Sequence, residues 1–150
     1  MIETSAFEVG QRFSGIKEVS GIKDNPMILA MLKLDGEWPE HDEVPWCSAF
    51  TNFICWILRL PRSKSLRARS WLGVGHRIPL ENARVGCDVV VLSRGDGTQP
   101  GPEVMDAPGH VGFYAGHDEI HIQVLGGNQG NTVSVRSYRR DRLLGIRRLT

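Results

Sequence analysis

The chain has little of what marks membrane proteins, disulfide-rich secreted proteins or nucleic-acid-binding proteins. No stretch approaches the roughly 18 consecutive apolar residues of a membrane-spanning helix. The 18 Lys and Arg residues nearly balance the 17 Asp and Glu residues, so the net charge of +1 gives no sign of a nucleic-acid partner. Three cysteines are an odd number and too few for a disulfide framework, which favours free thiols.

The first residues also lack a targeting signal. The sequence MIETS at residues 1–5 has no basic region, and no apolar run of signal length follows it. We therefore expect a protein that is made in the cytoplasm without a signal peptide. A length of 150 residues predicts a single domain, 1–150, that buries roughly 70% of the surface of its unfolded chain.

The strongest pattern that the sequence does contain is a helical segment near its middle. Pro45 suits the first position of this helix, because its missing N–H costs nothing there. Cys47 would then lie in the first turn, where unpaired N–H groups and the helix dipole favour a thiolate. The alternative is that Cys47 is only a small buried apolar residue, which is how we interpret Cys55 and Cys87. The apolar residues with helical spacing are Trp46, Phe50, Phe53, Ile54, Ile57 and Leu58.

The rest of the first half is also predicted to be helical. Ser5 and Glu8 have the form of a capping box and begin a helix that should reach Gly15. Asn25 and Pro26 read as an N-cap followed by a first-turn proline. The first half is completed by an acidic loop at residues 37–43 and a shorter helix, capped by Ser65, that ends near Gly73.

The second half has the pattern of strands. Residues 88–92 are a β-branched run typical of a buried strand, and further strands are predicted at 110–115, 120–125, 133–135 and 144–149. The long loop at 93–109 is rich in Gly, Pro and Asp, which is typical of functional loops. Helices followed by an antiparallel meander predict an α+β fold with a sheet of about five strands.

A thiolate nucleophile needs an imidazole, and His110 is the best candidate. It opens a strand after the long loop, between two glycines that leave room around it. His41 and His76 lie in predicted loops, and His117 lies at the hairpin turn. His121 would be about 20 Å along the strand ladder, too far away to contact His110.

A third group should orient the imidazole, and the register of the hairpin helps to choose it. Depending on where the turn is centred, Leu125 or Gly127 would lie opposite His110. Asn128 is then within reach, and Gln129 is the second candidate. A neutral amide is sufficient, because the thiolate and imidazolium already form a charge pair and only the ring needs orienting.

Three motifs in this order resemble a known group of proteins. They are PWCSAF at 45–50, GHVGFY at 109–114 and LGGNQ at 125–129. Together they resemble the papain-like cysteine hydrolases of bacteria and phages, namely the NlpC-type cell-wall peptidases and the CHAP domains. The predicted N-terminal helix and LLGIRR at 143–148 resemble phage-associated members.

The resemblance implies a papain-like fold and the cleavage of an amide bond in bacterial peptidoglycan. It implies that Cys47 is the nucleophile and His110 the base, with Asn128 as the third catalytic residue after the asparagine of the CHAP pattern. No cofactor and no metal are implied. The wall would be reached after lysis, phage injection or delivery by a secretion system, and an immunity or delivery protein would then be a further partner.

The sequence departs from both families at the third position. CHAP domains usually have a glutamate where Gly126 stands, and NlpC-type members often have a second histidine about where Ile122 stands. Gln129 and His121 therefore remain alternatives to Asn128. Trp46, Trp38 and Tyr114 are candidates for the walls of the substrate site or for the core.

Two other classes of function are weighed against this one. A zinc amidase would have to gather three or four ligands at one point, but His117 and His121, four residues apart, lie too far from each other. A wall-binding or phage-structural module with an inert Cys47 would use the cationic stretch at 136–142, for which we prefer a solvated strand face.

Overall fold

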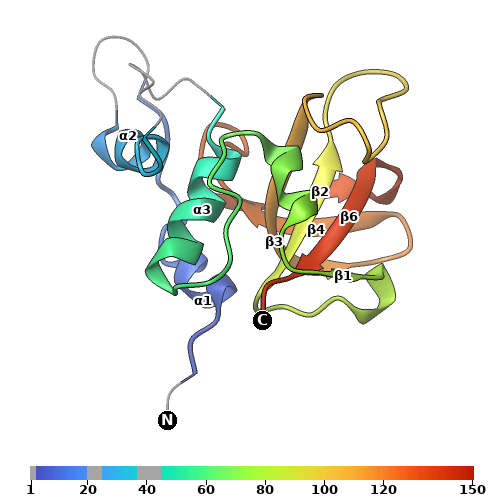
Figure 1. Cartoon of the computed structure of the whole chain (residues 1–150), viewed down its shortest axis with the longest axis horizontal. Coiled ribbons are helices and arrows are strands. Elements are labelled where there is room, and N and C mark those ends of the chain that lie inside the picture. Colours follow the sequence, from blue (N-terminus) through green and yellow to red (C-terminus); the bar gives the residue numbers. More distant parts are fainter. Residues whose placement is uncertain (1–2, 20–24, 37–44) are drawn as a thin grey trace.

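The computed structural model describes residues 3–19, 25–36 and 45–150. These residues form an α+β fold in which helices pack on one antiparallel sheet, as predicted (Figure 1). The helices are α1 (Ala6–Gln11), α2 (Pro26–Leu32) and α3 (Cys47–Ile57), with short 3-10 helices η1 (Ala68–Gly73), η2 (Leu80–Asn82) and η3 (Arg140–Arg142). The strands are β1 (His76–Ile78), β2 (Asp88–Ser93), β3 (Gly109–His117), β4 (His121–Gly126), β5 (Ser134–Arg139) and β6 (Leu143–Arg148).

The first two helices begin where the sequence predicts. The Ser5 hydroxyl accepts from the Glu8 backbone N–H, and the Glu8 carboxylate accepts from the Ser5 N–H at 2.8 Å, which completes the capping box. The Asn25 side chain accepts from the N–H of Met27 at 2.9 Å. α1 ends at Gln11, earlier than expected, because the chain then turns and Gly15 donates to the carbonyl of Val133 beside β5.

α3 begins later than its proline suggests. Trp46 is the N-cap residue and Cys47 is the first helical residue, so the prediction that Pro45 occupies the first helical position is wrong. Trp46 is fully buried, and its indole N–H donates to Glu18 at 2.7 Å, which fixes this residue in a non-helical conformation. Cys47 nevertheless lies in the first turn, as predicted.

The sheet has six strands in the order β1-β6-β2-β3-β4-β5, and every neighbouring pair is antiparallel. Strands β2 to β5 form the predicted meander, and β6 returns to pair with the free side of β2. The prediction of about five strands missed β1, which has only three residues and is too short to show a periodic pattern.

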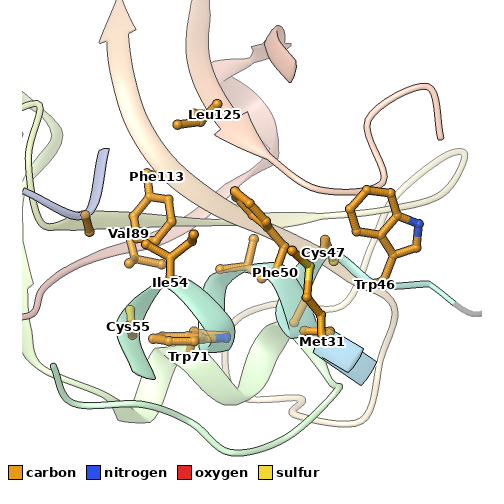
Figure 2. Close-up of a cluster of buried hydrophobic side chains, with 14 of the residues drawn as sticks. Met31, Trp46, Cys47, Phe50, Ile54, Cys55, Trp71, Val89, Phe113 and Leu125 are labelled. Carbon is orange, nitrogen blue, oxygen red and sulfur yellow. The ribbon is translucent and has the colours of Figure 1, made fainter. Parts of the chain in front are cut away.

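α3 packs against one face of the sheet and lies between α2 and the strands (Figure 1). Figure 2 shows the apolar side chains of α3 within the main buried cluster. There the rings of Phe50 and of Phe113 in β3 pack edge to face, with their centroids 6.3 Å apart. A second buried cluster, which includes Leu92, Tyr114 and Ile122, forms apart from the first. The main cluster fixes the position of the helix start relative to β3.

The register of the β3–β4 hairpin differs from the predicted one. Leu125 lies opposite Phe113, not opposite His110. A bulge between Tyr114 and Gly116 and a connection in which the Asp118 carboxylate accepts two backbone N–H bonds shift the pairing. His110 therefore lies beyond the last paired residues of β3 and β4, Phe113 and Leu125, and is level with the loop that follows β4.

Within the described ranges, no helix has the length and apolar character that crossing a bilayer requires.

Candidate active site

The start of α3 is fixed by buried polar contacts around Cys47. Ser48 donates from its hydroxyl to the carbonyl of Ser65 at 2.6 Å and accepts from the indole N–H of Trp71 at 2.9 Å. The Asn52 side chain donates to the carbonyls of Ser48 and Ser65 at 3.1 Å each. Because these groups are buried and paired, they hold the first turn rigidly, and Cys47 is only 3% exposed.

His110 is the second residue of β3, and the long loop before it is held by a buried arginine. Arg69, in η1, is fully buried and donates through Nε to the carbonyl of Pro108 at 3.0 Å. Its Nη1 lies within hydrogen-bond distance of three further carbonyls, those of Pro100, Gly101 and Val104. A planar guanidinium can bind several carbonyls at once, which orders the approach of the chain to His110.

The His110 ring contacts the side-chain amide of Gln129. His110 Nε2 and Gln129 Oε1 are 2.8 Å apart. The other end of this amide, Nε2 of Gln129, donates to the carbonyls of Val124 at 3.0 Å and Ser134 at 2.6 Å. Two carbonyl acceptors require the NH2 group at that end, so the amide oxygen must face the imidazole.

This arrangement determines the tautomer of His110. The Gln129 oxygen can only accept, so Nε2 of His110 carries a hydrogen and donates it. Nδ1 is then the nitrogen left for Cys47, and in the neutral ring it is an acceptor. A proton on Nδ1 makes the imidazolium, which can donate to the thiolate while the bond to Gln129 stays in place.

Electrostatics in the site favour the charged pair. Burial raises the pKa of the Cys47 thiol, but the hydrogen bond and charge of His110 and the N–H of Val111 together hold this pKa below its ordinary value of 9.0. Burial lowers the pKa of His110, and the interactions with Cys47 and Gln129 outweigh it, so the pKa lies above 6.5. A thiolate beside an imidazolium is the reactive form of a cysteine nucleophile.

Tyr138 of β5 is a further contact of the His110 ring. The two ring centroids are 5.1 Å apart with an interplanar angle of 33°, and the Tyr138 hydroxyl lies 3.3 Å from Nε2. Burial raises the pKa of Tyr138 to about 12, so the hydroxyl stays protonated at neutral pH. Sequence reasoning missed Tyr138, because it lies within the stretch 136–142 that was interpreted as a solvated face.

The structure corrects the choice of the orienting residue. The amide on the His110 ring belongs to Gln129, the second candidate, and not to Asn128. Asn128 has a positive φ of 57°, which turns the chain so that Gln129, one residue later, is buried beside His110. Asn128 itself is partly exposed and lines the cleft beside the ring.

Two glycines before Asn128 allow the loop to approach the helix. A Cβ on Gly127 would lie 2.6 Å from the Trp46 ring and 2.7 Å from the Cβ of Phe50. A Cβ on Gly126 would lie 2.7 Å from the Gln129 amide oxygen. A side chain at position 126, where CHAP domains usually carry a glutamate, would therefore displace the Gln129 amide from its present position.

The other histidines lie apart from His110. His121 begins β4, and His117, which ends β3, is opposite Ile122, so both are at the far end of the hairpin. His76 begins the outer strand β1, whereas His41 lies outside the described residues. In the described ranges, no three or more His, Cys, Asp and Glu side chains gather as a metal site would require.

The aromatic residues expected around the substrate have other positions. Trp46 is fully buried in the core (Figure 2), and Tyr114 is in the second cluster with its hydroxyl 2.6 Å from Nδ1 of His117. Neither is a wall of the site, and Trp38 lies outside the described residues. A cleft of about 260 Å³ instead adjoins His110 and is lined by Ser93, Arg94, His110, Asn128, Gln129, Gly130, Tyr138 and Arg142.

Comparisons with known proteins support the fold. No protein-family profile matches the chain, and no curated protein sequence matches it. A solved structure described as NlpC1 from Trichomonas vaginalis superposes with a TM-score of 0.56 at 14% sequence identity. The match covers 96% of this chain and 42% of that one, so the chain spans less than half the length of the matched protein. The two proteins share a fold.

Proposed function

We propose that this protein is a cysteine-dependent hydrolase that cleaves an amide bond in the stem peptide of bacterial peptidoglycan. One observation carries the proposal, namely the chain of contacts from Cys47 through His110 to Gln129. A buried thiol, an imidazole and an orienting amide are the groups that nucleophilic amide hydrolysis requires. The NlpC1 fold and the resemblance of the three motifs favour peptidoglycan as the substrate.

The first half of the reaction forms a thioester. The Cys47 thiolate attacks the carbonyl carbon, and the carbonyl oxygen becomes an oxyanion that accepts from backbone N–H groups at the start of α3, including that of Cys47. When the tetrahedral intermediate collapses, the C–N bond breaks and the His110 imidazolium gives its Nδ1 proton to the departing amine. The acyl group stays on the sulfur.

The second half releases the acid. Nδ1 of His110, now neutral, removes a proton from a water molecule that attacks the thioester carbon. The C–S bond breaks and leaves a carboxylic acid, the Cys47 thiolate and the imidazolium. The acid then releases its proton to the solvent and becomes a carboxylate. Gln129 keeps Nε2 protonated throughout, so the same nitrogen serves both half-reactions.

Digestion of purified sacculi tests the proposal. Mass spectrometry of the soluble muropeptides should show one cleaved amide bond with the wild-type protein and none with the Cys47→Ala variant. Hydrolysis should survive EDTA and stop after thiol alkylation, because the nucleophile is a sulfur atom. Hydrolysis that EDTA abolishes and alkylation spares would establish a metal-dependent amidase and discard the proposal.

Binding without hydrolysis would favour a different class of protein. If the wild-type protein sediments with sacculi but releases no muropeptide, the alternative of a wall-binding module with an inert Cys47 holds. The exposed arginines of the stretch 136–142 would then be the binding surface, and their substitution should release the protein from the sacculi.

A further inference from the structure

The cleft beside His110 is cationic. Two of its lining residues are arginines, Arg94 directly after β2 and Arg142 directly before β6, and none of its described lining residues is a carboxylate. Besides His110, the other polar side chains that line it are neutral amides or hydroxyls, from Ser93, Asn128, Gln129 and Tyr138. The charge of the lining residues thus favours the binding of an anionic group.

Among the described residues, Arg94 is the cation of this cleft that has no partner. Arg142 donates from Nη1 to the carbonyl of Gly95 at 2.9 Å, and the neighbouring Arg139 is paired with Asp141 at 2.8 Å. In the described part of the chain, by contrast, the Arg94 guanidinium makes no ion pair with a carboxylate and no hydrogen bond. An exposed guanidinium in the same cleft as His110 is available to a ligand, and its planar fork suits a carboxylate.

Arg94 also acts on the reacting groups at a distance. Its charge helps to hold the pKa of Cys47 below its ordinary value, and it opposes the rise in the pKa values of His110 and Tyr138. Its field therefore reaches the sulfur atom, and an anion bound in the cleft would lie beside the imidazole.

We propose that Arg94 and the cleft around it bind a free carboxylate of the substrate close to the scissile amide. This inference rests on the proposed function, and it names the feature of the peptide that the site selects. A stem peptide in which that carboxylate is free should be a good substrate, and the same peptide with a carboxamide there should be a poor one. Arg94 is then a specificity residue.

Alkylation of Cys47 tests the inference independently of hydrolysis. Iodoacetate and iodoacetamide react at the same carbon and lose the same iodide, but one carries a carboxylate and the other a carboxamide. We define the acid preference as the ratio of their rates at Cys47, with the modified site identified by mass spectrometry. The thiolate fraction cancels in this ratio, so a change in the pKa of Cys47 does not affect it.

The matched variants are Arg94→Gln, Arg94→Lys and Arg84→Gln. Arg84 is exposed and lies before β2, whereas Arg94 lies directly after it, so the control removes the same charge at the other end of one strand. Arg94→Gln should lower the acid preference about two- to fivefold, the range of an exposed charge pair. Arg94→Lys and Arg84→Gln should keep it. High salt should reduce the wild-type preference to that of Arg94→Gln.

An acid preference that is equal in Arg94→Gln and Arg84→Gln would overturn the inference. A pair of synthetic stem peptides, free acid and carboxamide, then separates the two proposals. If the wild-type protein cleaves both with equal kcat/KM, the carboxylate site is wrong and the hydrolase stands. If it cleaves neither while the acid preference depends on Arg94, the anion site stands and the proposed hydrolase is wrong.

Discussion

The two ends of the β3–β4 hairpin carry histidines that differ in burial and in the number of side chains that contact them. At one end, His110 is 5% exposed and contacts Gln129, Tyr138 and Cys47. At the other end, the His121 side chain is 44% exposed and lies 3.7 Å from the Asp118 carboxylate. The same residue type on the same hairpin is thus a buried, oriented imidazole at one end and a largely solvated side chain at the other.

The difference arises from what lies beyond each end of the strands. Beyond the His110 end lie the start of α3 and the loop that carries Gln129, and both supply partners that are themselves fixed by buried hydrogen bonds. The His121 end closes in a short exposed turn, where the Asp118 carboxylate accepts from two N–H groups of the turn and exposed Arg140 donates to two of its carbonyls. Chemistry at a histidine therefore follows from the partners that the tertiary structure brings to it.

The largest expected effect is the loss of hydrolytic activity on substitution at the His110 end of the hairpin, with little effect of substitution at the His121 end. Cys47→Ala and His110→Ala should each reduce the release of muropeptides by about 10³-fold or more, because nucleophile and base act as a unit. His117→Ala and His121→Ala should stay within about twofold of wild type, as expected of exposed side chains. A His121→Ala variant as inactive as His110→Ala would break the comparison.

The next effect concerns the orienting amide. Gln129→Ala should reduce turnover by roughly 10- to 1,000-fold, because His110 loses its fixed tautomer and the carbonyls of Val124 and Ser134 lose a donor. Binding of intact sacculi should barely change.

Asn128→Gly is the matched control for Gln129→Ala. It removes an amide from the same loop and tolerates the positive φ at that position. Asn128→Gly should keep most of the activity. The reverse order, with Asn128→Gly inactive and Gln129→Ala active, would contradict the geometry.

The three cysteines should also differ in reactivity. Iodoacetamide at about pH 6 should label Cys47 ahead of Cys55 and Cys87, because only Cys47 has an imidazolium partner. Burial raises the pKa of Cys55 to about 12, so this thiol should be the least reactive of the three. Peptide mapping by mass spectrometry measures the order. Equal labelling of Cys47 and Cys55 would mean that no thiolate forms at the helix start.

The smallest effect is on the pH dependence of stability. The raised pKa of His110 contributes stability that is complete below 6.5 and is lost as the pH rises toward its folded value. The lowered pKa of Cys47 contributes stability that is complete above 9.0 and is lost as the pH falls toward its folded value. Because the two slopes have opposite signs, they cancel where the two ranges overlap between 6.5 and 9.0, so the pair should give a plateau there and a decline on both sides.

Denaturant unfolding of the wild-type protein and of Cys47→Ala measures this contribution. The difference between their free energies of unfolding should be flat across the plateau and should change by up to about 1.4 kcal/mol per pH unit outside it. A difference that changes steadily through the neutral range would show that the folded pair takes up or releases a proton there, and it would contradict the plateau.

The sequence by itself determined the local features of this protein. The helical period around Phe50, the capping box of Ser5 and Glu8 and the alternation of the strands are properties of neighbouring residues, and they predicted the α+β fold correctly. The nucleophile candidate was also local, because a position in the first turn of a helix defines the environment of Cys47.

The tertiary structure decided which groups meet. The choice of Gln129 over Asn128 depends on a bulge in β3, a positive φ and two carbonyl acceptors, and none of these can be read from a period of two or 3.6 residues. Tyr138 and Arg69 reach the site or its loop from distant segments through burial and hydrogen bonding. Such contacts depend on packing between elements, which the pattern along a single element does not specify.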